Sequence, residues 1–220
     1  MTTDNLQIAR PERRPSPGRQ AYLRQRREAT RAAILQAARG VFAQCNYIDA
    51  KIEDIIRAAG VSRATFYAHF ESKLELAYAI YDEIVPQTTA LFDALPEAGD
   101  AGIDAIKAWL RAFADIHVEH RYVTPLIAQL QLFESGFRQR VLNDSEGFID
   151  RLARSGVRGF AETAGTGPEA RRQRVHARLV TNRAAAVCAE IARGETSPAD
   201  TEIVLDLVGR ELLEFMAGTR

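Results

Sequence analysis

Helical periodicity of the apolar residues is the feature that most constrains how this chain can fold. From about Arg24 onward, apolar residues recur at spacings of three and four, and no segment shows the alternation of a half-buried strand. Clusters of Gly, Pro and Ser divide this pattern into segments. The sequence therefore predicts an all-α protein. After the N-terminal third, helices are expected near residues 74–93, 101–120, 124–134, 137–163, 169–193 and 199–217.

Length and composition fit a small domain joined to a larger one. The 220 residues are 46% hydrophobic and 26% charged, an ordinary globular composition that excludes a fibrous or wholly disordered chain. No run approaches the roughly 18 apolar residues of a membrane span, and the N-terminus lacks a secretion signal. We therefore expect a cytoplasmic protein with no membrane partner. Cys45 and Cys188 show no metal-site spacing, which favours two buried thiols.

The formal net charge of +0 hides an uneven distribution of charge. Residues 1–73 hold 13 basic against 7 acidic residues, whereas residues 74–220 hold 16 against 22. A basic segment joined to an acidic one is typical of a nucleic-acid-binding part attached to a part with another role, although a plain solvated surface is an alternative. The proline-rich and arginine-rich residues 1–23 predict a basic flexible arm. This arm either enters a minor groove or is a solvated tail.

The segment from Ile52 to Phe70 has the form of a helix-turn-helix motif. Apolar residues at helical spacing follow Ile52, and Gly60 stands where a left-handed residue ends a helix at little cost. Ser62 is a good N-cap with hydrophobic residues at the staple positions around it, so a short second helix should begin there. This arrangement predicts a helical pair of the kind that presents its second helix to DNA.

The exposed face of the second helix is small and polar. If Phe66 and Phe70 point to the core, Ala64 and Ala68 point outward, and the helix can sit deep in a major groove. We expect Arg63 to contact a guanine, with flanking residues contributing to base preference or contacting phosphates. The predicted DNA-binding residues are Lys51, Ser62, Arg63, Ala64, Thr65, Tyr67, His69 and Lys73.

The string Ala59-Gly-Val-Ser-Arg-Ala-Thr-Phe-Tyr-Ala-His-Phe-Glu-Ser-Lys-Leu74, preceded by Arg31-Ala-Ala-Ile-Leu-Gln-Ala-Ala38, resembles the DNA-binding domain of TetR-family transcriptional regulators. The likeness extends over about residues 24–78. It implies about nine helices in two domains: a helix-turn-helix domain over 24–72, and a ligand-binding and dimerisation domain over 73–220. It also implies a homodimer that binds a palindromic operator, usually as a repressor, and that a small molecule releases.

Two positions depart from the family pattern. Asn46 stands where Gly is common, and Ala50-Lys51 replaces a frequent Thr-Thr pair. Asn tolerates the left-handed conformation that Gly would supply. Lys51 then either contacts a phosphate in place of a Thr hydroxyl or is simply solvated.

The last predicted helix is apolar around nearly its whole circumference between Ile203 and Met216. Such a helix must be covered on both sides, most simply by its own domain and by a second copy of itself. The resemblance likewise implies dimerisation through the last two helices. The expected interface residues are Val187, Ile191, Val204, Val208, Leu212 and Phe215.

The resemblance places a ligand pocket among the central helices, and their aromatic residues indicate a small, largely apolar effector. Plain core is the alternative for each aromatic side chain. The candidate pocket residues are Trp109, Phe113, His117, Tyr122, Phe133, Phe137 and Phe148.

An all-helical enzyme or small-molecule-binding protein with no DNA role is the second hypothesis. His117 and His120 share a helix face but lack further ligands, so neither a metal nor another cofactor is predicted. The sequence contains no phosphate loop and no arguable nucleophile–histidine pair, which disfavours an enzyme. Activation and repression of transcription stay open as alternatives.

Overall fold

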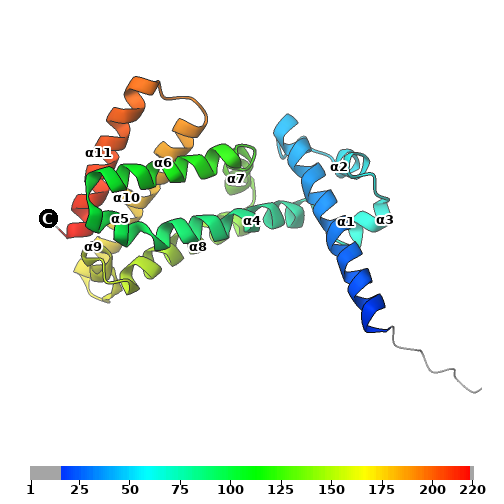
Figure 1. Cartoon of the computed structure of the whole chain (residues 1–220), viewed down its shortest axis with the longest axis horizontal. Helices are drawn as coiled ribbons and strands as arrows, with labels where there is room; N and C mark the ends of the chain where they lie inside the picture. Colours follow the sequence, from blue (N-terminus) through cyan, green and yellow to red (C-terminus); the bar gives the residue numbers. More distant parts are fainter. Residues whose placement is uncertain (1–15, 219–220) are drawn as a thin grey trace, which may run out of the picture.

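The computed structural model describes residues 16–218, and all the regular secondary structure of that range is helical, as the sequence predicts (Figure 1). Helices α1 to α3 lie together at one end of an elongated molecule, and α4 connects them to the bundle of later helices. The helices are α1 (Pro17–Gln44), α2 (Ile52–Ala59), α3 (Arg63–Tyr67), α4 (Lys73–Asp93), α5 (Leu95–Ala101), α6 (Ile103–Glu119), α7 (Val123–Phe133), α8 (Ser135–Arg154), α9 (Arg158–Ala161), the 3-10 segment η1 (Glu162–Ala164), α10 (Pro168–Ala192) and α11 (Pro198–Ala217).

The hydrophobic core of the N-terminal helices continues into the larger domain. Ile34 of α1, Ile55 of α2 and Phe66 of α3 are fully buried in it. The same cluster includes Leu130 of α7 and Phe137 of α8. The N-terminal domain therefore shares one core with α4, α7 and α8, and hydrogen bonds from Gln129 of α7 to the α1–α2 turn add a contact besides α4.

A second hydrophobic core fills the bundle at the opposite end. It is built mainly from α6, α8, α10 and α11, with Leu110, Ile149 and Leu205 among its buried residues. Helices α10 and α11 lie side by side along one flank of this bundle (Figure 1). No helix within residues 16–218 combines the length and apolar character that crossing a membrane requires.

The first helix begins earlier than the sequence analysis expects. Pro17 occupies the first turn of α1, so residues 17–23 are helical and the prediction of a flexible arm is wrong for them. Proline breaks a helix in its interior but is well tolerated in the first turn, where its missing N–H has no partner to lose. The rest of the predicted arm, residues 1–15, lies outside the described residues.

Two further segments differ from the predicted helices. Residues 95–101 form α5 in the gap between the helices predicted over 74–93 and 101–120, since Pro96 again lies in a first helical turn. The helix expected over 137–163 is divided into α8 and α9. Gly156 lies between them with φ of 84°, a left-handed conformation that interrupts the helical path.

Gly159 allows α9 to approach the backbone of α11. A Cβ atom added at Gly159 would lie 1.8 Å from the carbonyl oxygen of Phe215, whereas one added at Gly147 of α8 would meet nothing within 4 Å. We expect Gly159→Ala to lower the free energy of unfolding by about 1–3 kcal/mol, because the two backbones must separate. The matched variant Gly147→Ala should be neutral or stabilising by up to about 1 kcal/mol. Chemical denaturation checks both values, and equal stability of the two variants would contradict this packing.

Candidate nucleic-acid interface

Local capping positions the short helix α3. Gly60 ends α2 in the left-handed conformation, with φ of 64°. The Ser62 Oγ then accepts a hydrogen bond from the backbone N–H of Thr65 at 3.0 Å, which caps α3. Phe66 and Phe70 are buried, while Ala64 and Ala68 are exposed, as the helical wheel predicts. The outward face of α3 is therefore shallow and open to a large partner.

Arg63 lies on this face and is paired with an acid. Its Nη1 donates to Oε1 of Glu53 at 2.7 Å, and its guanidinium lies 5.6 Å from the centroid of the Tyr67 ring. A hydrogen bond with its own backbone amide and the nearby Arg63 both lower the pKa of Glu53, so the carboxylate is ionised at neutral pH. Contact between Arg63 and a base requires the arginine to leave this carboxylate.

Arginines of α1 extend the basic surface beside α3. Burial, followed by the charges of Arg27 and Arg31, lowers the pKa of His69. The guanidinium of Arg31 also lies 5.0 Å from the Phe70 ring centroid. Neither arginine is among the DNA-binding residues predicted from the sequence. Their spacing of four residues, with Arg24 three residues earlier, places all three on one helix face and could have shown it.

The other predicted DNA-binding residues lie around the same face. Tyr67 is exposed, His69 is half-exposed, and Lys51 is an exposed residue at the N-cap of α2. Lys51 has no ion pair within the part of the chain that the structure describes. Seven of the eight predicted residues are thus at least partly exposed, and their contact with DNA stays a prediction.

Lys73 is the exception. Its ammonium donates hydrogen bonds to the backbone carbonyls of Tyr47, Ile48 and Ala50, at 3.2 Å for Ile48 and 2.8 Å for Ala50. The ammonium also lies 4.5 Å from the centroid of the Tyr47 ring. Burial lowers its pKa. These contacts use all three donors of the ammonium, so the predicted phosphate contact is replaced by a structural role in holding the α1–α2 turn.

The predicted pocket residues do not line one cavity. Phe113 and Phe148 line a cavity of about 80 Å³ near Phe92, whose ring stacks on Phe148 at a centroid distance of 4.6 Å. The indole N–H of Trp109 donates to the carbonyl of Leu91 at 2.7 Å in the adjoining core.

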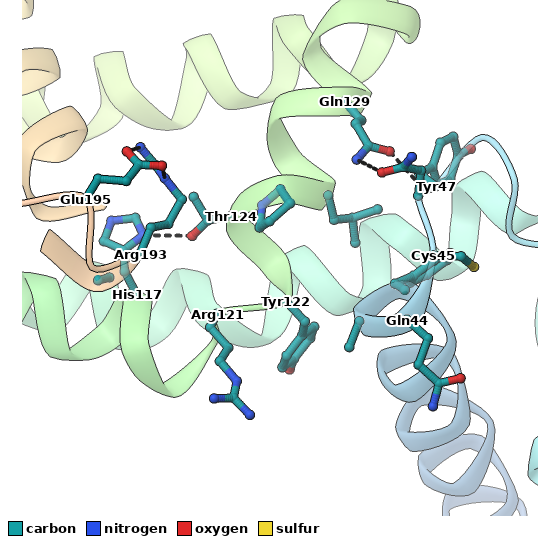
Figure 2. A pocket seen from close by; sticks show the side chains of 16 residues that line it. Gln44, Cys45, Tyr47, His117, Arg121, Tyr122, Thr124, Gln129, Arg193 and Glu195 are labelled. Carbon is teal, nitrogen blue, oxygen red and sulfur yellow. Dashed lines mark hydrogen bonds and ion pairs between the residues drawn. The ribbon is translucent and has the colours of Figure 1, made fainter. Parts of the chain in front are cut away.

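The remaining predicted pocket residues lie elsewhere. Phe137 is buried against Tyr78 and Tyr81, and Phe133 is exposed on the surface of α7, so neither lines the cavity. His117 and Tyr122 line a separate cleft (Figure 2). Within residues 16–218, no three metal-binding side chains come together.

The predicted dimer residues belong largely to the core of the single subunit. Val208, Leu212 and Phe215 are buried there, because the inner face of α11 packs on α6, α9 and α10. These three are therefore not on a surface that a second copy could cover. The other three predicted residues are half-buried against the same core; they are Val187, Ile191 and Val204.

The Glu53–Arg63 pair makes a testable contribution to DNA binding. We expect Glu53→Gln to tighten binding to a random duplex by roughly threefold to tenfold at low salt, because it frees Arg63 and removes a negative charge facing the phosphates. Glu97→Gln, which removes the same charge from an exposed site on α5, should leave binding unchanged. Fluorescence anisotropy measures both affinities, and a weaker Glu53→Gln complex would show that the pair assists binding instead.

Substitutions of Lys73 and of Arg27 should differ in how they change the salt dependence of DNA affinity. Lys73→Met should weaken DNA binding with an unchanged slope of log affinity against log salt, because it displaces the α1–α2 turn without removing a phosphate contact. Arg27→Gln should reduce the magnitude of the slope by about one unit. A smaller slope for Lys73→Met would restore the phosphate role predicted for that residue.

Comparison with known proteins supports this interface. Residues 34–80 match the family model for bacterial regulatory proteins of the tetR family. The HTH-type transcriptional activator FasR of Mycolicibacterium smegmatis is 35% identical over 117 residues, which cover 53% of this chain and 52% of that protein. The chain thus matches about half the length of this curated relative.

Solved structures extend the likeness in fold to most of the chain. A TetR-like transcriptional regulator from Rhodococcus sp. RHA1 gives a TM-score of 0.57 at 22% identity, covering 88% of this chain and 97% of that one. The regulator FadR from Bacillus subtilis, solved in complex with stearoyl-CoA, gives a TM-score of 0.57 at 15% identity, and the match covers 86% of this chain and 99% of that one. The match to the tetR family of bacterial regulatory proteins is thus confined to the N-terminal helix-turn-helix domain, and the larger helical domain is similar to these regulators in fold.

Proposed function

We propose that this protein is a cytoplasmic, ligand-responsive transcriptional regulator that binds a palindromic operator as a homodimer and represses by occupying it. The observation that carries the proposal is the exposed face of α3, with Arg63 and Ala64 open and Arg27 and Arg31 beside it. Small side chains let the helix approach base edges, and the arginines supply phosphate and guanine contacts. The proposal makes the protein a DNA-binding regulator and not an enzyme.

The outer faces of α10 and α11 support dimerisation. Arg183 of α10 and Glu211 of α11 form an ion pair at 3.1 Å across these two helices. One helical turn away on each helix lie Leu179 and Leu207, which are 63% and 62% exposed, and Ile203 continues the row on α11. Apolar side chains grouped around an ion pair suit an isologous interface. Such a dimer would place its two α3 helices about 34–36 Å apart, the spacing of successive major grooves.

The aromatic cavity supports an apolar effector of the kind proposed. Its volume of about 80 Å³ is well below the roughly 300–1,000 Å³ of ordinary ligand sites, so an effector must open it by moving the rings of Phe92, Phe113 and Phe148. The stearoyl-CoA bound to FadR shows that a protein of this fold takes a ligand with a long apolar chain. Movement of α4, which contributes Phe92, would then reposition the N-terminal domain.

A gel shift on DNA flanking the gene of this protein, repeated across a salt series, tests the proposed function. We expect tighter binding to one palindromic site than to random duplex, with affinity falling as salt rises. A reporter driven by that site then gives the sign of regulation. Absence of binding to any duplex at low salt would favour the alternative of a helical small-molecule-binding protein or enzyme.

Leu207 provides a direct test of the dimer. We expect Leu207→Arg to dissociate the dimer and to weaken operator binding at least tenfold, because charges would then face each other across the two-fold axis. Leu132→Arg is the matched control, since Leu132 of α7 is 73% exposed and lies outside α10 and α11. Analytical ultracentrifugation reports the change in mass. A dimeric Leu207→Arg protein would place the interface elsewhere.

A further inference from the structure

An open cleft of about 890 Å³ lies between the N-terminal domain and the helical bundle (Figure 2). Three separate parts of the chain line it: the end of α1 with the α1–α2 turn, the α6–α7 turn with α7, and the end of α10. Figure 2 shows His117, Arg193 and Glu195 on one side, and Gln44, Cys45 and Tyr47 on the other. The cleft is separate from the aromatic cavity, with which it shares no lining residue.

Apolar side chains contribute to the walls of this cleft. Phe42 of α1 and Leu126 of α7 are buried, and Tyr122 and Pro125 also line the cleft. Apolar walls of this kind suit the flat face of a ring or a short hydrocarbon body.

His117 supplies an unfulfilled hydrogen-bonding group in this cleft. Its Nδ1 lies 3.0 Å from the hydroxyl of Thr124, whereas its Nε2 is buried and has no hydrogen-bond partner among the described residues. Burial, followed by the charges of Arg193 and His120, lowers the pKa of His117, so the ring is neutral at pH 7. A buried ring nitrogen without a partner costs free energy, so a ligand that displaces its neighbours and reaches this nitrogen would gain a hydrogen bond.

The cleft lining has one unpaired charge, the positive charge of Arg121. Arg193 and Glu195 form two parallel hydrogen bonds of 2.7 Å and cancel each other. Arg121 is exposed on the α6–α7 turn and has no ion pair in residues 16–218. Glu195 is the only acidic side chain in the lining and is already paired, so Arg121 is the lining charge left for an added anion, with Glu119 and Glu134 acting from behind the lining.

We propose that this cleft binds a small organic anion, a carboxylate carried on an aromatic or alicyclic body, and that binding repositions the α1–α2 turn. Arg121 supplies the counter-charge, His117 a hydrogen bond, and the apolar walls the contact for the ring. This site goes beyond the proposed function, because it is distinct from the aromatic cavity and takes a ligand of different chemistry.

The same cleft wall holds the turn that precedes α2. Gln129 of α7 accepts a hydrogen bond from the backbone N–H of Tyr47 at 2.7 Å and donates one to Oδ1 of Asn46 at 3.1 Å. All three residues line the cleft. A ligand that contacts this wall therefore changes the support of the turn from which α2 and α3 start, which couples the cleft to the DNA-binding surface.

Calorimetric titration of the full-length, DNA-free protein tests the site with defined probes at constant ionic strength. We expect 1-naphthoate to bind with Kd below about 1 mM, and its neutral analogue 1-naphthalenemethanol and inorganic phosphate to bind at least tenfold more weakly. Arg121→Gln and Ala43→Trp should each weaken naphthoate at least tenfold. The first removes the charge, and the second fills the cleft from an exposed position on α1. Arg154→Gln, at the end of α8 and outside the cleft, should change nothing.

The outcomes separate the proposal from its rivals. Equal binding of the neutral analogue would exclude recognition of the anion, and binding unaffected by Arg121→Gln and Ala43→Trp would place the ligand elsewhere, for example in the aromatic cavity. Absence of naphthoate binding would overturn the site. Coupling predicts altered hydrogen exchange in the peptide spanning residues 44–50, and unchanged exchange at saturation would refute it. None of these measurements uses DNA, so they are independent of the proposed regulatory function.

Discussion

The position of α3 depends on one half-buried ammonium group. The Nζ of Lys73, at the start of α4, draws the carbonyls of Tyr47, Ile48 and Ala50 to a single point. These carbonyls belong to the turn between α1 and α2, so no helical hydrogen bond satisfies them on this side. A charged donor forms stronger hydrogen bonds to these carbonyls than a neutral donor would, and the same bonds offset the cost of removing the ammonium from water. The turn, α2 and α3 are thereby fixed to the first residue of α4.

This fixation changes how a signal can pass through the molecule. The core around Phe66 continues to Leu130 of α7 and Phe137 of α8, so the N-terminal domain cannot swing freely about α4. A ligand must instead move α4 or α7 together with the surfaces packed on them. The aromatic cavity contacts α4 through Thr88 and Phe92, and the open cleft contacts α7 through Gln129. A ligand in either site would thus act on a helix that holds the α1–α2 turn: α4 does so through Lys73 and α7 through Gln129, and each makes a hydrogen bond to Tyr47.

Local features of the fold were predictable and long-range contacts were not. The caps at Gly60 and Ser62 follow from residue chemistry within a few positions, and their geometry is as predicted. The sequence predicts that Lys73 binds DNA, because the carbonyls that its ammonium contacts lie more than 20 residues earlier in the chain and no local pattern shows them. The apolar circumference of α11 indicated two covered faces without showing which residues serve each, so Val208 was assigned outward although it is buried. Proline in a first helical turn resembles a helix breaker in sequence, which concealed the start of α1.

The pairing of Arg63 with Glu53 bears on how such a surface can distinguish sequences. An ion pair between exposed side chains contributes little net free energy, because water solvates both groups well. A bidentate contact with guanine is stronger, since it adds two directed hydrogen bonds in a groove that excludes part of the water. Exchange of the carboxylate for guanine is then favourable, whereas at other bases the arginine gains less by leaving Glu53. The carboxylate therefore competes with guanine for Arg63: a guanine contact bears the full cost of breaking the pair, whereas at other bases Arg63 can stay paired, so the pair reduces the difference in affinity that this contact could otherwise supply.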